Sequence, residues 1–153
     1  MAANFNPIYT ATPNFGMVLI PTATAQVKSD GTSAGTGTDI MYKVFTAGAN
    51  GSFLETIRFQ CVAQAAATTS VATTLRAYIS TVASPGATTN TDTSLLGEIS
   101  VPAQSASHST NATNYYDMVI AKPIPTGYYV HVSQHVAQTT NQAWQALAFG
   151  GDY

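Results

Sequence analysis

The side chains that could bind a metal ion are three histidines and one cysteine. His131 and His135 fall on one face of an expected β-strand, where four residues at about 3.3 Å each separate them by roughly 13 Å. Because each ligand of a zinc ion lies about 2 Å from it, this pair cannot chelate within one subunit. Only a symmetry axis could bring copies of one histidine together around an ion. The simpler interpretation is that both histidines are polar residues on an outer face. With His108 in a polar tract and Cys61 in the inward phase of an apolar strand, we expect no metal and no other cofactor.

Nucleophilic and phosphate chemistry also lack their usual residues. The chain has no G-x-S-x-G nucleophile elbow, and a buried cysteine such as Cys61 commonly packs as a small hydrophobic side chain. The stretch G-T-S-A-G-T-G-T-D (residues 31–39) resembles a phosphate loop, but it has no lysine to reach the phosphates and no helical pattern follows it. Asp30 and Asp39 could instead bind calcium, yet no ligand ladder joins them, so a plain connection between strands is favoured.

Acidic residues are too few to suggest a hydrolase. Outside the glycine-rich loop and the tail, the carboxylates are Glu55, Asp92, Glu98 and Asp117. Glycoside hydrolysis needs two carboxyl groups that flank the scissile bond, and nothing in the sequence pairs these four. We therefore predict that the protein is not an enzyme.

Aromatic residues leave a binding function open. Eight tyrosines and one tryptophan could supply stacking faces for a sugar, or could pack in the core and at subunit contacts, which we favour. The candidate surface or ligand aromatics are Tyr115, Tyr116, Tyr128, Tyr129 and Trp144.

The composition excludes several classes of partner. Only 8% of the residues are charged, against about 25% in ordinary globular proteins, and the net charge is -2. Five widely spaced lysines and arginines cannot form the basic footprint of direct nucleic-acid binding. No apolar run reaches the roughly 18 residues of a membrane helix. The start M-A-A-N-F-N-P lacks the features of a secretory signal, which indicates synthesis in a reducing cytoplasm.

The residue pattern predicts an all-β fold. β-branched and aromatic residues dominate, with Gly, Pro, Asn and Asp at the breaks. We expect a single antiparallel β-sandwich, jelly-roll-like, with about eight strands. The expected strands cover residues 16–27, 40–46, 53–63, 71–80, 95–101, 115–121, 128–136 and 142–149.

Alternation within two strands indicates which side chains point inward. In the strand 53–63, Ile57 and Phe59 share one phase while Leu54 lies out of phase with them, so we predict a bulge near Glu55. In the strand 128–136, valines alternate with polar residues, and we expect one face in the core and one outside it.

The two ends of the chain are expected to make contacts beyond the sandwich. Residues 1–15 suit an extended N-terminal arm, because prolines and apolar side chains alternate with polar ones, and residues 16–153 form the sandwich domain. The predicted arm contacts, to another subunit or to a capsid, are Phe5, Pro7, Ile8, Tyr9, Pro13 and Phe15. At the other end, the glycines of F-G-G-D-Y let the chain leave its last strand, and we place Phe149 and Tyr153 at a C-terminal seam.

Two segments carry a resemblance to a known group of proteins. V-F-T-A-G-A-N-G-S-F-L-E-T-I-R-F (residues 44–59) and A-L-A-F-G-G-D-Y (residues 146–153), with L-R-A-Y-I-S, L-L-G-E-I-S-V-P and P-I-P-T-G-Y-Y-V-H-V-S in order between them, resemble small virion proteins of tailed bacteriophages. The similarity covers about residues 15–153. This sequence differs from the plainest version of the pattern by its longer loops at residues 30–39, 84–93 and 104–114.

The resemblance implies a capsid decoration or cement protein, with a β-sandwich fold and no catalytic residues. It implies two partners, the major capsid protein and further copies of this chain, typically as a trimer, and a location on the capsid surface of the virion after synthesis in the host cytoplasm. The alternative function is a carbohydrate- or receptor-binding or connector module of a head fibre, collar or tail.

Overall fold

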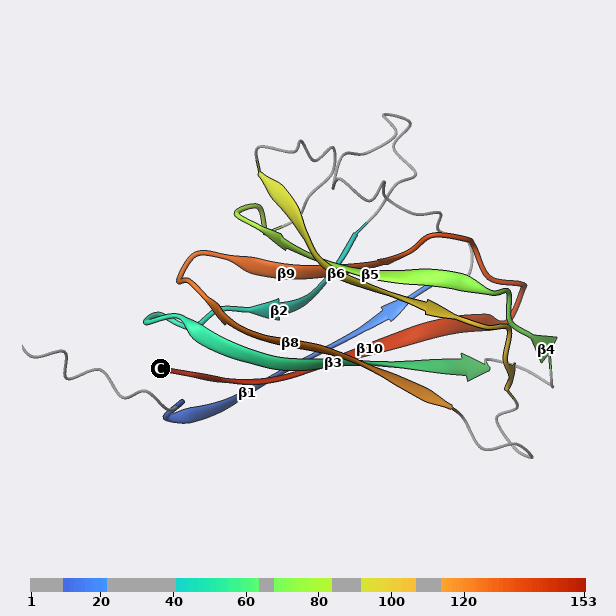
Figure 1. The fold of residues 1–153 in the computed structure, drawn as a ribbon, viewed down its shortest axis with the longest axis horizontal. Helices are drawn as coiled ribbons and strands as arrows, with labels where there is room; N and C mark the ends of the chain where they lie inside the picture. Colours follow the sequence, from blue (N-terminus) through green and yellow to red (C-terminus); the bar gives the residue numbers. More distant parts are fainter. Residues whose placement is uncertain (1–9, 22–40, 64–67, 84–91, 107–113) are drawn as a thin grey trace, which may run out of the picture.

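Two antiparallel four-stranded sheets pack face to face in the computed structural model, which describes residues 10–21, 41–63, 68–83, 92–106 and 114–153 (Figure 1). The first sheet, called sheet A, contains β1 (Thr12–Ile20), β10 (Gln142–Asp152), β3 (Ser52–Ala63) and β8 (Tyr115–Ile124), in that order. Sheet B contains β2 (Tyr42–Thr46), β9 (Tyr129–Gln134), β5 (Thr73–Ser80) and β6 (Thr93–Val101), in that order. A short pair, β4 (Thr68–Thr69) and β7 (Ser105–Ala106), lies at one end. The predicted all-β sandwich of about eight strands is confirmed.

The strand pairs are nested in the way that defines a jelly roll. β1 pairs with β10, β2 with β9, β3 with β8 and β5 with β6. A long antiparallel hairpin that is rolled up gives this pattern, because its successive outer and inner pairs alternate between the two sheets. The jelly-roll part of the prediction is therefore also confirmed.

The core lies between the sheets and is built from alternate residues of each strand. Sheet A contributes fully buried Ile57, Phe59 and Trp144, and sheet B contributes Leu75 and Val132. Strand alternation explains this selection, since every second side chain points to the same face.

A bulge at Glu55 joins the two apolar phases of β3, as predicted. Against β10, Thr56 pairs with Phe149 and Leu54 pairs with the next residue, Gly150, so Glu55 is the extra residue of β3. Leu54 and Ile57 are consequently both buried although they are three positions apart.

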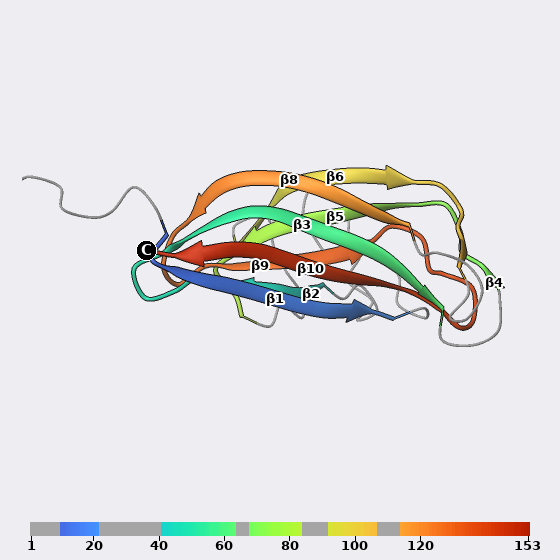
Figure 2. The same cartoon turned by 90° about the horizontal axis from the view of Figure 1, so that it is seen from below.

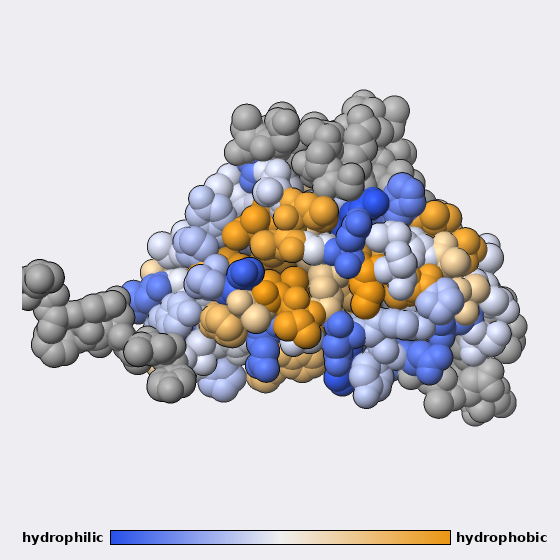
Figure 3. All heavy atoms as spheres, viewed as in Figure 1, coloured by the Kyte–Doolittle hydropathy of each residue, from blue (hydrophilic) through white to orange (hydrophobic). Residues whose placement is uncertain are grey.

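The sandwich nearly closes along both edges. On one edge β1 approaches β2 so closely that a Cβ on Gly16 would lie 1.5 Å from the Val44 carbonyl oxygen. On the other edge a Cβ on Gly97 of β6 would lie 3.3 Å from the sulfur of Met118 in β8. Figure 3 looks onto this second edge and shows apolar side chains gathered along it.

Two predictions about strands need correction. The first strand begins at Thr12 rather than at residue 16, so Pro13 and Phe15 belong to the sheet and not to an arm. It ends at Ile20, and residues 22–27 of the expected strand lie outside the described residues. Pro13 is compatible with β1 because β1 is an edge strand of sheet A, where a missing N–H breaks no ladder.

His131 lies on the outward side of sheet B, but the prediction that this side is a polar outer face is wrong. Its side chain is 0% exposed and it belongs to β9, the second strand of sheet B. On this outward side, Tyr78 packs with Met41 and Leu95 in a small apolar cluster separate from the main core. Both faces of β9 are therefore buried, which the simple alternation of its sequence did not reveal.

Candidate functional site

The outward side chains of sheet A form four rows, and together these sixteen positions are called face A. Figure 2 looks onto this side of the molecule. Each row runs across β1, β10, β3 and β8 in register. The rows are Pro13–Gly151–Phe53–Pro123, Phe15–Phe149–Thr56–Val119, Met17–Leu147–Arg58–Asp117 and Leu19–Gln145–Gln60–Tyr115.

Face A is apolar and open to solvent. Phe15, Met17 and Val119 are 69%, 68% and 72% exposed, and Tyr115 is 57% exposed. Five of the seven exposed large apolar side chains in the described part of the chain lie on this face, the fifth being Leu19. Scattered apolar side chains are normal on a protein surface, but such a grouping marks an interaction site.

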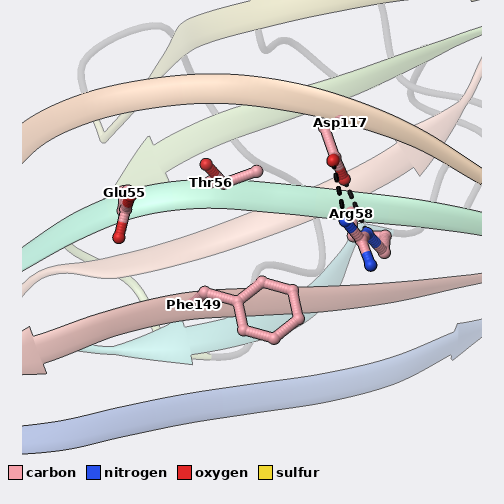
Figure 4. A pocket seen from close by; sticks show the side chains of 5 residues that line it. All are labelled: Glu55, Thr56, Arg58, Asp117 and Phe149. Carbon is pink, nitrogen blue, oxygen red and sulfur yellow. Dashed lines mark hydrogen bonds and ion pairs between the residues drawn. The ribbon is translucent and has the colours of Figure 1, made fainter.

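The Arg58–Asp117 ion pair lies in the third row of face A (Figure 4). The Arg58 guanidinium donates two hydrogen bonds to the Asp117 carboxylate, at 2.7 and 2.8 Å. Its carbon Cζ also lies 4.0 Å from the ring centre of Tyr115 and 5.9 Å from that of Phe149. The hydrogen bond to Arg58 lowers the pKa of Asp117, so this carboxylate stays ionised and paired. The only charges in the four rows therefore cancel each other.

An open hollow of about 320 Å³ lies beside this pair and is lined by Glu55, Thr56, Arg58, Asp117 and Phe149. Figure 4 shows these side chains on neighbouring strands around the bulge of β3. Phe149 is held by an edge-on contact with Phe15, with ring centres 5.8 Å apart. Arg58 already holds the Asp117 carboxylate, so the polar groups that the hollow offers to a ligand are this ion pair and the exposed carboxylate of Glu55.

Residues 10 and 11, which precede β1, lie beside the first row of face A. Gly151 points outward, and a Cβ on it would lie 2.5 Å from the Cβ of Thr10, so Thr10 fills the space that a side chain would need. The amide of Ala11 donates a hydrogen bond to the carbonyl of Asp152 at 2.7 Å. Residues 10 and 11 are thus tied to the end of β10, and they are not part of a free arm.

Only some of the predicted contact residues meet on one surface. Pro13, Phe15 and Phe149 lie on face A, whereas Phe5, Pro7, Ile8 and Tyr9 lie outside the described residues. Tyr153 is half-buried, and its amide donates to the carbonyl of Gly51 at 3.2 Å. The residues that sequence reasoning missed are Met17, Leu19, Arg58, Val119 and Leu147. The signal that could have found Met17 and Leu19 is that both alternating sets of residues in β1 are apolar.

The candidate aromatics divide in the same way. Trp144 is 0% exposed and cannot stack on a ligand, so its place among possible surface aromatics is wrong. Tyr116 is half-buried and meets Trp144 edge-on at 6.0 Å. Tyr115 is exposed on face A, while Tyr128 is half-buried and packs against the core. Tyr129 belongs to sheet B, where the Lys43 ammonium lies 5.3 Å from its ring centre.

Asp152 has a structural role at the end of β10. Its carboxylate accepts hydrogen bonds from the Asn14 amide at 2.7 Å and from the Ser52 hydroxyl at 2.5 Å. The Ser52 oxygen in turn accepts from the amide of Gly48 at 2.8 Å. Asp152 thus joins the last strand to β1 and to the turn that leads into β3.

The cysteine, histidine and carboxylate side chains that could bind a metal ion do not cluster in the described ranges. Cys61 is fully buried, burial raises the pKa of its thiol, and the thiol lies 3.3 Å from the Gln142 side-chain oxygen. No group of three or more His, Cys, Asp or Glu side chains that could hold a metal ion occurs in the described ranges. Asp30, Asp39 and His108 lie outside them.

His131 makes a pH-dependent contribution to stability. Burial lowers its pKa below the ordinary value of 6.5, the nearby positive charge of Lys43 lowers it further, and a hydrogen bond to the Val82 carbonyl opposes these two effects. Its Nε2 lies 3.0 Å from that carbonyl oxygen, which makes Nε2 the donor, and Nδ1 has no partner among the described residues. The folded protein therefore holds this imidazole neutral.

We expect the free energy of unfolding to fall as the pH drops below 6.5. In that range the unfolded chain takes up a proton that folded His131 resists, so acid favours unfolding. Urea titrations at about pH 7.5 and about pH 5.5 measure the loss. His131→Gln, which removes the titrating group, should reduce this loss. Equal losses in the parent protein and in His131→Gln would contradict this assignment.

No helix in the described part of the chain is long and apolar enough to cross a membrane.

Comparisons with known proteins give one weak similarity. No protein-family model matches the chain, and no curated protein matches it. Among solved structures, it is similar to the VP2 subviral particle of infectious bursal disease virus, with 14% identity and a TM-score of 0.31. The aligned region covers 99% of this chain and 37% of the VP2 chain. A TM-score this low supports no conclusion about this protein.

Proposed function

We propose that this protein is a structural virion protein of the tailed-bacteriophage decoration type, which binds the capsid surface and stabilises it. The observation that carries the proposal is face A, a sheet face with its apolar side chains open to solvent. Such a face suits protein–protein contact, since its ion pair is already satisfied and its apolar rows gain by leaving water. The proposed partners are the major capsid protein and other copies of this chain. The proposed location is the virion surface, after synthesis in the host cytoplasm.

The resemblance to virion proteins supports this function through residues with structural roles. Its two end segments, residues 44–59 and 146–153, meet in the fold, where Asp152 bonds to Ser52 and Ser52 to Gly48. These residues hold strands and turns together, as expected for a motif that preserves a scaffold. The low charge of the chain agrees with an assembly role, because an uncharged surface costs less to desolvate than a charged one.

Binding to particles tests the proposal. Purified protein, added to capsids that lack it, should bind saturably at a copy number that matches the many subunits of the shell lattice, as measured by co-sedimentation and gel densitometry. Saturation at a single vertex would instead indicate a collar or tail component. Absence of binding to any part of the particle would refute a virion role.

Deleting residues 1–9 tests the predicted arm. The deletion should weaken particle binding and leave the unfolding midpoint unchanged, because Thr10 and Ala11, which are tied to the end of β10, are kept. A deletion that continued to Phe15 would remove four residues of β1, including part of its pairing with β10, and is not a clean test. Unchanged particle binding by the shorter deletion would overturn the arm assignment.

A second candidate function is binding of a carbohydrate or receptor on a fibre, collar or tail. The hollow beside Arg58 favours it, because an aromatic ring, an arginine and two carboxylates line one open space. The guanidinium already lies against the Tyr115 ring at 4.0 Å, which leaves that ring less free to stack on a sugar. Glycan-array binding that is lost in Tyr115→Ala would favour this function over capsid decoration.

A further inference from the structure

Face A has the size that contact between two protein surfaces requires. Strands lie about 4.8 Å apart, and outward residues repeat about every 6.7 Å along a strand. Four rows on four strands therefore cover roughly 19 by 27 Å, or about 500 Å² in projection. The accessible surface of a face with protruding side chains is larger than its projection, and it approaches the roughly 800 Å² that each partner buries in a standard interface.

The charges of face A are compatible with an identical face. Arg58 and Asp117 neutralise each other within the third row. Two exposed side chains beside these rows, Glu55 and Lys122, also have opposite signs. A strongly charged partner would find no complement here, whereas a second copy would bring no excess of like charge. The whole chain has a net charge of only -2, so repulsion between copies is small.

Other exposed apolar regions are less suited to this role. Along the edge between β6 and β8, Met118 and Ile120 are buried and Leu96 and Ile99 are half-buried against the core. On the outward side of sheet B, Tyr78 and His131 are fully buried. Face A combines four paired strands with exposed apolar side chains, which a sheet-to-sheet contact needs.

We propose that two copies of this chain pack face A against face A, as the two sheets of a sandwich do. The same patch then serves both partners, so the contact is isologous and has two-fold symmetry. A trimer, by contrast, is built from head-to-tail contacts between different patches. This inference rests on the proposed function, which names other copies of this chain as partners. It adds that the contact between copies forms pairs.

Sedimentation equilibrium of the full chain, without particles, tests the pairing. The parent protein should form dimers, or larger oligomers that are built from dimers. Met17→Lys and Val119→Lys should each weaken association by at least roughly tenfold, because every two-fold interface then buries two unpaired ammonium groups. Val136→Lys, at a 39% exposed position outside face A, is the matched control and should associate like the parent protein. Circular dichroism should show that all three variants are folded, since none of these side chains lies in the core.

Two results would overturn the pairing. One is a parent protein that stays monomeric at every accessible concentration, and the other is association that neither face A variant weakens. Particle co-sedimentation, run in parallel, separates this failure from failure of the proposed function. Monomers that bind particles and lose this binding in Met17→Lys would assign face A to the shell and refute the pairing alone. Dimers that never bind particles would support the pairing and refute the virion role alone.

Discussion

Trp144→Ala should lower the free energy of unfolding by about 3 to 5 kcal/mol. Trp144 is the largest fully buried side chain. It lies in β10 between Ile20 of β1 and Cys61 of β3 and meets Tyr116 edge-on. Alanine would remove these contacts and leave a cavity that the paired strands cannot collapse to fill. Urea titration followed by far-ultraviolet circular dichroism measures the loss without using the fluorescence of the residue that is removed.

Trp144→Phe is the matched control. Phenylalanine keeps an aromatic ring in the core, and it removes an indole N–H that is buried without a hydrogen-bond partner among the described residues. We therefore expect a much smaller loss than for alanine. A midpoint in Trp144→Ala equal to that of the parent protein would show that the residue does not support the core.

Gly16→Ala should also destabilise the fold, by about 1 to 3 kcal/mol or more. In an unconstrained strand the same change would help, since glycine is less favourable than alanine by about 0.5 to 1 kcal/mol. Here the added Cβ would lie 1.5 Å from the carbonyl oxygen of Val44 and 2.7 Å from its carbonyl carbon. Both atoms belong to the backbone, so β1 must move away from β2, and the hydrogen bond from Asn14 to the Thr46 carbonyl is weakened with it.

Gly97→Ala on the opposite edge provides the comparison for this prediction. Its Cβ would lie 3.3 Å from the sulfur of Met118, an atom near the end of a flexible side chain. We expect a change close to zero, because Met118 can adjust where the backbone of Val44 cannot. Thermal unfolding of both variants measures the difference. If Gly16→Ala were as stable as Gly97→Ala, the close approach of β1 and β2 would be disproved.

The strands could be predicted because their local signals agree. Turn residues bound each apolar run, and the alternation in β3 is sufficient to predict the bulge at Glu55 that the register with β10 shows. The boundaries of β1 were less predictable, since Pro13 and Phe15 fit an extended arm as well as an edge strand. The register with Gly151 and Phe149 of β10 resolved this, and that pairing joins residues far apart in the chain.

The sequence predicts only part of the candidate site on face A. The sequence predicts Phe15, Phe149 and Tyr115 as contact residues, but of different surfaces. It also predicts Trp144 as a possible surface aromatic, although this side chain is buried. Met17 and Leu19 alternate with Val18 and Ile20, so both phases of β1 are apolar and periodicity cannot say which one is the core. Arg58 and Asp117 gave no pattern at all, because they meet only when β3 pairs with β8.

Residue types and their short-range spacing are sufficient to predict the class of fold, the phase of most strands and the low charge of the chain. These properties depend on residue type and short spacing, which sterics and alternation translate directly into local structure. Which sheet face is covered and which is open depends on contacts between distant parts of the chain, and local patterns do not predict it. Alternation shows only that a strand has two faces. His131 and Tyr78 on sheet B are buried, with contacts to residues distant in sequence such as Val82 and Met41, whereas Phe15, Met17 and Val119 on sheet A are exposed.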